Sequence, residues 1–296
     1  MNSTLPDTPH KNQFIESKRS AYINLSRILR PTGIILLWIP CLWGLALQTN
    51  DIYSFLYKSL VYLLGATSLR TVGCIINDIA DKDFDAQVTR TKQRPLAAGT
   101  LSIKEAIIFA FICLIPGLYV FTNLPPANKM IGLLGLTGAF IYPLCKRFTN
   151  WPQLMLGLLF NIGIWIIGYG SIPVMNLIAL YTAGICWTLA YDTIYAFQDL
   201  EDDLIAGVKS TAVRFKNAPK LAITLFYTGM MLALAALGYM NNASLLYYVS
   251  LVLLSVYLTI YLYFWNHNNT KQCLQFFKDN QMIGMSILFL LLLLIF

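Results

Sequence analysis

The residues in this chain best suited to chemistry form two aspartate clusters within an otherwise apolar sequence. Nine of the fourteen acidic residues lie in or beside these clusters. The members that could act are Asp78, Asp81 and Asp85 in the first cluster and Asp192, Asp199 and Asp203 in the second. One carboxylate at the centre of a membrane helix costs about 2.5–3.5 kcal/mol on insertion scales. Several acids kept together therefore indicate a counter-charge. Two carboxylate groups of this kind are what divalent metals and a diphosphate would need.

The spacing predicts that each cluster occupies one face of a helix. In the first cluster the aspartates recur every three or four residues, and Asn77 shares their face. In the second they recur seven and eleven residues after Asp192, and Tyr195 lies on that face. Like charges this close repel by about 4 kcal/mol per pair at an effective dielectric constant of 20. Mg²⁺ removes the conflict because it binds one or two carboxylates together with substrate phosphates.

Basic residues beside the clusters are candidates for binding a diphosphate. They are Lys92, Arg94, Arg147 and Lys209. A cation at such a position stabilises the charge that develops on a departing diphosphate. The alternative for each residue is the ordinary excess of lysine and arginine in cytoplasmic loops of membrane proteins.

The composition predicts an all-α, polytopic membrane protein. Of the 296 residues, 57% are hydrophobic and 12% are charged, and the mean hydropathy is +0.61. A soluble domain carries about 25% charged residues. The net charge of +7 does not indicate nucleic acid binding, because the basic residues are spread over several loops. With only two histidines, a histidine-rich zinc or iron site is excluded.

Nine apolar segments are long enough to predict nine transmembrane helices. They cover residues 32–49, 57–77, 104–123, 127–145, 153–171, 174–196, 219–240, 244–265 and 280–296. With this count, eighteen lysines and arginines fall on one side of the membrane and two on the other. The excess places the N-terminus and both acidic clusters on the cytoplasmic side. We expect one domain over residues 1–296, with residues 1–30 as an uncleaved cytoplasmic leader.

The acidic clusters resemble the signature motifs of a known family. Asn77-Asp78-x-x-Asp81-x-x-x-Asp85 resembles the N-D-x-x-D-x-x-x-D motif of the UbiA superfamily of intramembrane prenyltransferases, and Asp199-x-x-x-Asp203 resembles its second motif. Within the superfamily, the stretches 191–211, 94–96 and 142–153 resemble the enzymes that prenylate 4-hydroxybenzoate. The resemblance extends over nearly the whole chain.

The resemblance implies an all-α fold with nine transmembrane helices around a central cavity, and a Mg²⁺-dependent enzyme of ubiquinone biosynthesis. It would transfer a polyprenyl group from polyprenyl diphosphate to the ring carbon ortho to the phenol of 4-hydroxybenzoate. The metal ligands would be Asp78, Asp81, Asp85, Asp199 and Asp203, and the acceptor-binding residues would be Arg30, Asn77 and Tyr195. The expected location is a bacterial inner membrane, with the active site on the cytoplasmic side. No obligate protein partner is evident.

Three other functions remain open from the sequence. A UbiA-type enzyme could use another acceptor, such as a naphthoate, haem or chlorophyllide. A cation-coupled transporter also buries carboxylates, although it would place them near the bilayer midplane. A non-catalytic scaffold leaves the paired acids unexplained. Metal-dependent release of pyrophosphate separates the enzyme from the transporter.

Overall fold

The computed structural model describes residues 17–87 and 91–294, and every regular element in them is helical. The long helices are α2 (Thr32–Gln48), α3 (Ile52–Ala80), α5 (Ile103–Thr122), α6 (Pro126–Phe148), α9 (Val174–Ala196), α12 (Pro219–Met240), α13 (Leu245–Phe264) and α14 (Thr270–Leu292). The shorter ones are α1 (Lys18–Ser26), α4 (Lys82–Asp85), α7 (Pro152–Phe160), α8 (Ile162–Gly168), the 3₁₀ turn η1 (Phe197–Asp199), α10 (Leu200–Ala206) and α11 (Thr211–Arg214). The predicted all-α class is confirmed. Most of the predicted leader lies outside the described residues.

Five helical stretches in the described part of the chain are long and apolar enough to cross a membrane. They are α3, α5, α12, α13 and the run Val174–Ile205 that begins with α9. Helix α2 and the pair α7–α8 are apolar but shorter. Many large apolar side chains face outward, among them Phe111 and Ile115 of α5 and Leu253 of α13. An outward apolar surface of this kind suits lipid, so the chain is a multi-pass membrane protein.

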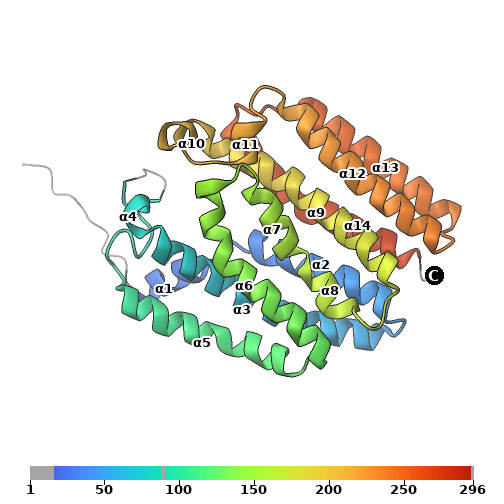
Figure 1. Cartoon of the computed structure of the whole chain (residues 1–296), viewed down its shortest axis with the longest axis horizontal. Coiled ribbons are helices and arrows are strands. Elements are labelled where there is room, and N and C mark those ends of the chain that lie inside the picture. The colour runs from blue at the N-terminus through green and yellow to red at the C-terminus, as the bar shows by residue number, and fades with distance from the viewer. Residues whose placement is uncertain (1–16, 88–90, 295–296) are drawn as a thin grey trace, which may run out of the picture.

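The long helices run roughly along one direction and pack side by side in a bundle (Figure 1). Contacts run in a ring from α2 to α3, α6, the α7–α8 pair, α9, α14 and back to α2. Helix α5 packs outside α3, while α12 and α13 pack outside α9 and α14. Helix α8 packs against α2 at a distance from the end that carries α4 and α10. The connecting segments that contain α4, α10 and α11 therefore lie at one end of the bundle (Figure 1).

Local signals in the sequence set the start of α3, which leads to the first acidic cluster, and of α5, which follows it. The Asp51 carboxylate accepts hydrogen bonds from the N–H groups of Tyr53 and Ser54 and begins α3. Ser102 and Glu105 form a reciprocal capping box at the start of α5. These caps satisfy backbone donors that would otherwise lack partners at the helix ends.

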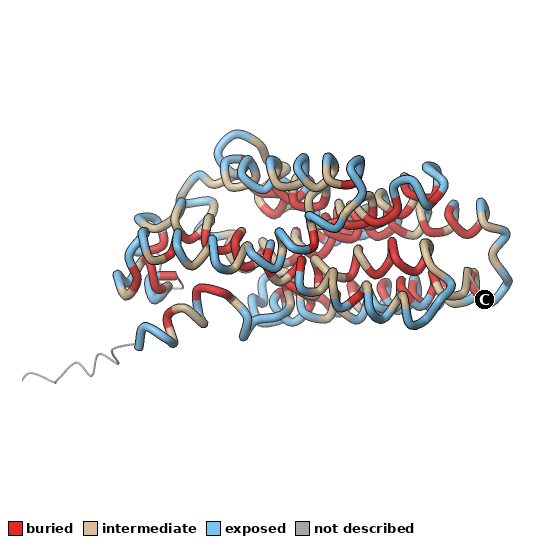
Figure 2. Tube along the Cα trace, turned by 90° about the horizontal axis from the view of Figure 1, so that it is seen from below, coloured by how far each residue is buried: buried red, intermediate tan, exposed pale blue. Residues whose placement is uncertain are grey.

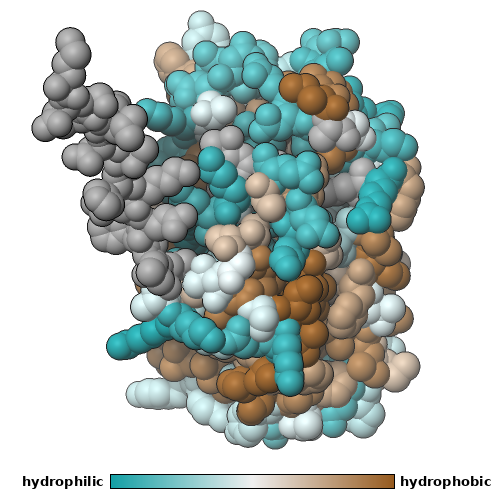
Figure 3. Space-filling view, turned by 90° about the vertical axis from the view of Figure 1, so that its left-hand side faces the viewer, coloured by the Kyte–Doolittle hydropathy of each residue, from teal (hydrophilic) through white to brown (hydrophobic). Residues whose placement is uncertain are grey.

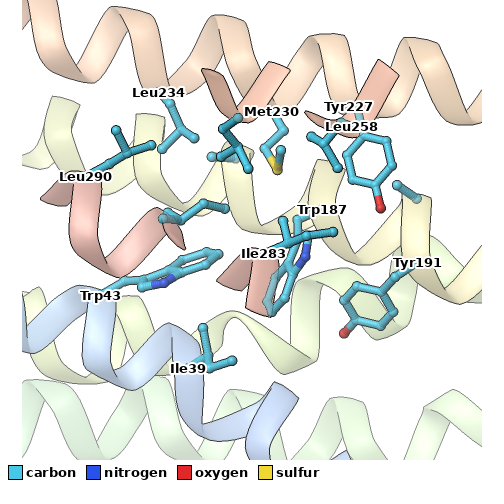
Figure 4. Close-up of a cluster of buried hydrophobic side chains, with 14 of the residues drawn as sticks. Ile39, Trp43, Trp187, Tyr191, Tyr227, Met230, Leu234, Leu258, Ile283 and Leu290 are labelled. Carbon is cyan, nitrogen blue, oxygen red and sulfur yellow. The ribbon is translucent and has the colours of Figure 1, made fainter. Parts of the chain in front are cut away.

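The main core consists of aromatic and aliphatic side chains contributed by α2, α9, α12, α13 and α14 (Figure 4). The Trp187 ring lies 5.1 Å from the Trp43 ring and 5.0 Å from the Tyr191 ring, centroid to centroid. All three residues are fully buried. Figure 2 shows that buried residues follow the inward sides of the long helices. Large rings packed in this way immobilise the helices that carry the second acidic cluster.

Asn280 of α14 joins three helices inside this core. It accepts hydrogen bonds from Trp187 Nε1 of α9 at 3.0 Å and from the Tyr227 hydroxyl of α12 at 3.1 Å. Its own amide donates to the Phe276 carbonyl at 2.8 Å. Because Asn280 has no exposed surface, water cannot replace these bonds when the side chain is lost.

We expect Asn280→Leu to lower the apparent thermal midpoint of the detergent-solubilised protein. The substitution leaves two buried donors unpaired, at about 1–3 kcal/mol each. The matched control is Met282→Leu on the same helix, where the side chain is 68% exposed. Midpoints should be compared at one scan rate, because unfolding of membrane proteins is often irreversible. Equal midpoints for the two variants would contradict a structural role for Asn280.

Candidate active site

The first acidic cluster lies where α3 ends, at the end of the bundle that carries α4 (Figure 1). Helix α3 stops at Ala80, and Asp81 leaves helical geometry with φ −100° and ψ 6° before α4 begins. The predicted uninterrupted helix is therefore wrong at Asp81. Hydrogen bonds of helical type continue on both sides, since the Asp81 N–H donates to the Asn77 carbonyl and the Asp85 N–H donates to the Asp81 carbonyl. The kink changes the direction of Asp85 while keeping it close to the helix end.

Two arginines bind the buried carboxylates of this cluster. Arg27 Nη2 donates to Asp78 Oδ1 at 2.9 Å and to Oδ2 at 2.7 Å. Arg94 Nη1 donates to Asp78 Oδ1 at 3.2 Å and to Asp85 Oδ2 at 2.6 Å. Asp78 is 3% exposed and Asp85 is 4% exposed. The result is a charge network in the order Arg27, Asp78, Arg94, Asp85, in which two cations compensate two anions.

The second cluster lies on an almost continuous helical run, as its spacing predicts. Helix α9 carries Asp192 and Tyr195, η1 carries Asp199 and α10 carries Asp203. All four side chains are partly exposed. Gly207, with φ 68°, ends α10 in the left-handed conformation that favours glycine. The run therefore presents its acids at the same end of the bundle as α4 (Figure 1).

A small hydrogen-bond network fixes the segment that follows the second cluster. The hydroxyls of Thr193 and Thr211 are 2.7 Å apart, and both residues are fully buried. The Thr211 N–H donates to Gln153 Oε1 of α7 at 3.0 Å. The Ser210 hydroxyl caps α11 by accepting from the Val213 N–H. The segment 207–214 is thus tied to α9 and α7.

Arg70 connects the two clusters through the interior of the bundle. Its guanidinium lies against Gly33 of α2 and 5.7 Å from the centroid of the Phe160 ring of α7. The Cys74 thiol, the hydroxyls of Tyr142 and Tyr195 and the Asp192 carboxylate all lie within electrostatic range of it. Tyr142 of α6 interacts in turn with both Asp192 and Asp81. Helices α3, α6 and α9 therefore face one shared interior below the acidic segments.

The remaining candidates occupy different depths. Lys92 and Arg147 are exposed, and Arg30 is exposed in the turn between α1 and α2. Lys209 is partly exposed, and its Nζ donates to the Phe148 carbonyl at 3.4 Å. Seen end-on, this end of the molecule carries many hydrophilic side chains around a smaller apolar area (Figure 3). Arg90, the first residue of the basic loop, lies outside the described residues.

Two arginines at the site, Arg27 and Arg70, were not predicted from the sequence. Arg70 had a usable signal, because a single arginine within an apolar span marks a functional position by default. Arg27 had none, since it reads as one of several basic residues before the first span. Asn77 is partly exposed on α3, and the Tyr195 ring packs 4.5 Å from the Phe277 ring of α14.

The donor set suits Mg²⁺ bound jointly with a phosphorylated substrate. Among the described residues, no three His, Cys, Asp or Glu side chains are close enough to hold one ion by themselves. Mg²⁺ rarely uses such an all-protein cage and commonly combines one or two carboxylates with substrate phosphates. Partly exposed Asp81, Asp199 and Asp203, with basic residues nearby, meet that requirement.

Comparison with known proteins identifies the family of the chain. The model of the UbiA prenyltransferase family matches residues 37–293. The mitochondrial 4-hydroxybenzoate polyprenyltransferase of Drosophila pseudoobscura pseudoobscura is 39% identical over 295 residues, which cover 97% of this chain and 74% of that protein. The 4-hydroxybenzoate octaprenyltransferase of Francisella tularensis subsp. novicida is 40% identical over 277 residues, covering 90% and 94%.

Solved structures share the fold. A UbiA homolog from Aeropyrum pernix K1 superposes with a TM-score of 0.70 at 20% identity, over 87% of this chain and 97% of its own. A UbiA homolog from Archaeoglobus fulgidus bound to GPP and Mg²⁺ gives 0.66 at 21% identity, over 92% and 99%. Taken together with the match of the family model to most of the sequence, these relatives show that the chain belongs to the UbiA prenyltransferase family.

Proposed function

We propose that the protein transfers a polyprenyl group from polyprenyl diphosphate to the ring carbon ortho to the phenol of 4-hydroxybenzoate, a step of ubiquinone biosynthesis. The observation that supports the proposal is the position of the Arg70 guanidinium, which lies against Gly33 and the Phe160 ring and within electrostatic range of Tyr142 and Asp192. A cation inside and carboxylates at the mouth suit an acceptor with a carboxylate and a donor with a diphosphate. Relatives that act on 4-hydroxybenzoate, at about 40% identity, support this acceptor over haem or chlorophyllide.

In this proposal, four acidic residues are metal ligands, and Asp78 holds two arginines in place. In the proposal, Asp81 and Asp85 on one side and Asp199 and Asp203 on the other hold Mg²⁺ together with the diphosphate. Both Asp78 oxygens already accept hydrogen bonds from arginine, so Asp78 changes from the predicted ligand to an anchor for these arginines. When bound, Mg²⁺ supplies Lewis-acid stabilisation of the charge on the departing diphosphate.

Residues of the chain assist each stage of the transfer. Arg94 neutralises the diphosphate as the bond between its oxygen and C1 of the prenyl chain breaks. Lys92, Arg147 and Lys209 add positive charge around it. Arg70 binds the acceptor carboxylate and thereby orients the ring, with Asn77 and Tyr195 beside it. The ortho carbon then attacks C1 of the allylic cation, and loss of its proton restores aromaticity. Asp192 helps to hold Arg70 in place.

The proposed topology has nine spans in one domain, with the N-terminus and the active site on the cytoplasmic side. The excess of basic residues on that side supports it. The pair α7–α8 counts as one span interrupted at Asn161. A bacterial inner membrane remains the proposed location, although some relatives are mitochondrial. The polyprenyl tail would leave the interior toward lipid, since its length exceeds the space between the helices.

We expect Asp81→Asn and Asp199→Asn each to reduce prenyl transfer by more than about 100-fold, because even partners behind a metal ligand contribute 10- to 100-fold. Transfer is measured in detergent with radiolabelled 4-hydroxybenzoate. The matched controls are Asp83→Asn and Asp202→Asn, which neutralise exposed acids beside the same motifs. Full activity in either ligand variant would refute the proposed metal site.

Removal of divalent metal provides an independent test. EDTA should stop product formation and pyrophosphate release by the wild-type protein, and added Mg²⁺ should restore both. Each proposed ligand is a carboxylate, which repels the negatively charged diphosphate unless a bound metal cation lies between them. Turnover that persists in EDTA would exclude the metal-dependent mechanism.

We expect Arg70→Gln to raise the KM for 4-hydroxybenzoate by roughly 10- to 100-fold, because a hydrogen bond to a charged group contributes about 1.5–3 kcal/mol. The KM for the prenyl donor should change little. Arg30→Gln serves as the comparison, since Arg30 is the arginine that the sequence suggested for the carboxylate. An acceptor effect in Arg30→Gln alone would return that role to Arg30.

A further inference from the structure

Arg27 stands out because its backbone adopts a conformation that arginine seldom occupies. It ends α1 with φ 58° and ψ 13°, in the left-handed region where helix ends usually carry glycine. Such a residue persists only when its surroundings hold it there. The contacts of its side chain identify what does so.

The side chain of Arg27 reaches a carboxylate 51 residues further along the chain. One nitrogen, Nη2, donates to both oxygens of Asp78, and the Arg27 side chain is 19% exposed. Asp78 also accepts from Arg94, which reaches across to Asp85. Arg94 is thus shared between two buried acids, whereas Arg27 has only Asp78 as an acidic partner among the described residues.

Helix α1 is docked firmly enough to fix the position of Arg27. Ala21 and Leu25 are fully buried in a small core with Leu96 and Leu101, which lie in the segment that follows Arg94. The Thr71 hydroxyl of α3 donates to the Ser26 carbonyl at 3.1 Å. Lys18 pairs with Glu105 of α5 at 2.6 Å. One rigid unit therefore carries both arginines that bind Asp78.

The binding of a metal diphosphate would require a rearrangement of this network. Asp85 and Arg94 now neutralise each other, yet one is a proposed metal ligand and the other a proposed diphosphate ligand. Both must exchange this ion pair for the incoming substrate. If Arg94 were the only partner of Asp78, its movement to the diphosphate would leave the buried Asp78 carboxylate without a counter-charge. Asp78 would then compete with the diphosphate for Arg94. Arg27 removes that competition.

We propose that Arg27 is a positioning residue for the diphosphate site, which neutralises Asp78 so that Arg94 is free to bind the diphosphate. The inference rests on the proposed function. It adds a residue from the N-terminal helix to the donor site, and it gives Asp78 a role other than metal binding. It also predicts that loss of Arg27 weakens diphosphate binding, because the uncompensated charge of Asp78 would then hold Arg94.

The test measures the affinity for geranyl diphosphate with Mg²⁺ by calorimetry in detergent. We expect Arg27→Gln to weaken binding by about 10- to 100-fold, the usual effect of a partner behind a ligand. Arg27→Lys, which restores the charge, should recover much of the affinity. Arg19→Gln, an exposed arginine on the same helix, should match the wild type. The KM for 4-hydroxybenzoate should stay unchanged in all three variants.

The decisive variant combines Arg27→Gln with Asp78→Asn. Because the substitution at Asp78 removes the charge that captures Arg94, the double variant should bind geranyl diphosphate more tightly than Arg27→Gln alone. If Asp78 were a metal ligand, the double variant would bind more weakly still. That result, or wild-type affinity in Arg27→Gln, overturns the inference.

Two control measurements separate failure of this inference from failure of the proposed function and from misfolding. Failure of the wild type to bind geranyl diphosphate with Mg²⁺ would count against the proposed function itself. Thermal midpoints and gel filtration report folding of each variant. If Arg27→Gln does not fold, the comparison between Arg27→Lys and Asp78→Asn decides: donor affinity lost only in Asp78→Asn returns Asp78 to the metal ligands.

Discussion

The structure of the site depends on charge compensation for carboxylates that are almost removed from water. Asp78 and Asp85 are 3% and 4% exposed, and breaking one such buried pair typically costs about 3–5 kcal/mol. The two arginines that compensate them come from α1 and from the loop after α4. The ion pairs therefore do more than hold two side chains together. They require the N-terminal helix, the end of α3 and the loop 91–101 to fold as one unit.

A second, apolar unit supports the site from the core of the bundle. Trp43, Trp187 and Tyr191 pack as a continuous aromatic group, and Asn280 ties α14 to α9 and α12. Phe277 of α14 contacts the rings of both Tyr191 and Tyr195. Rigid packing in this core lets the polar end keep partly exposed acids without loss of order, because the helices that bear them are already immobilised.

Between these two units lies the interior around Arg70. A cation here is less solvated than at the surface, so neighbours that stabilise positive charge are favoured. The protein supplies the Cys74 thiol, two tyrosine hydroxyls, Asp192 and the Phe160 ring. The same preference explains why a substrate carboxylate suits this position. An exposed arginine such as Arg30 lacks this advantage, because water weakens its interaction with any anion.

The helical class, the membrane setting, the two acidic motifs and the family resemblance could be predicted from the amino-acid sequence, because they follow from composition and from spacing within single helices. The distribution of basic residues also indicated the same end of the bundle for both motifs. The contacts of Arg27 with Asp78, of Arg94 with Asp78 and Asp85, and of Arg70 with its neighbours became visible only in the folded protein. Periodicity reports which residues share a face of one helix, and it carries no information on contacts between helices. Arg27 and Asp78 are 51 residues apart in the sequence, and their contact depends on how the helices pack. The break of α3 at Asp81 depends on packing as well.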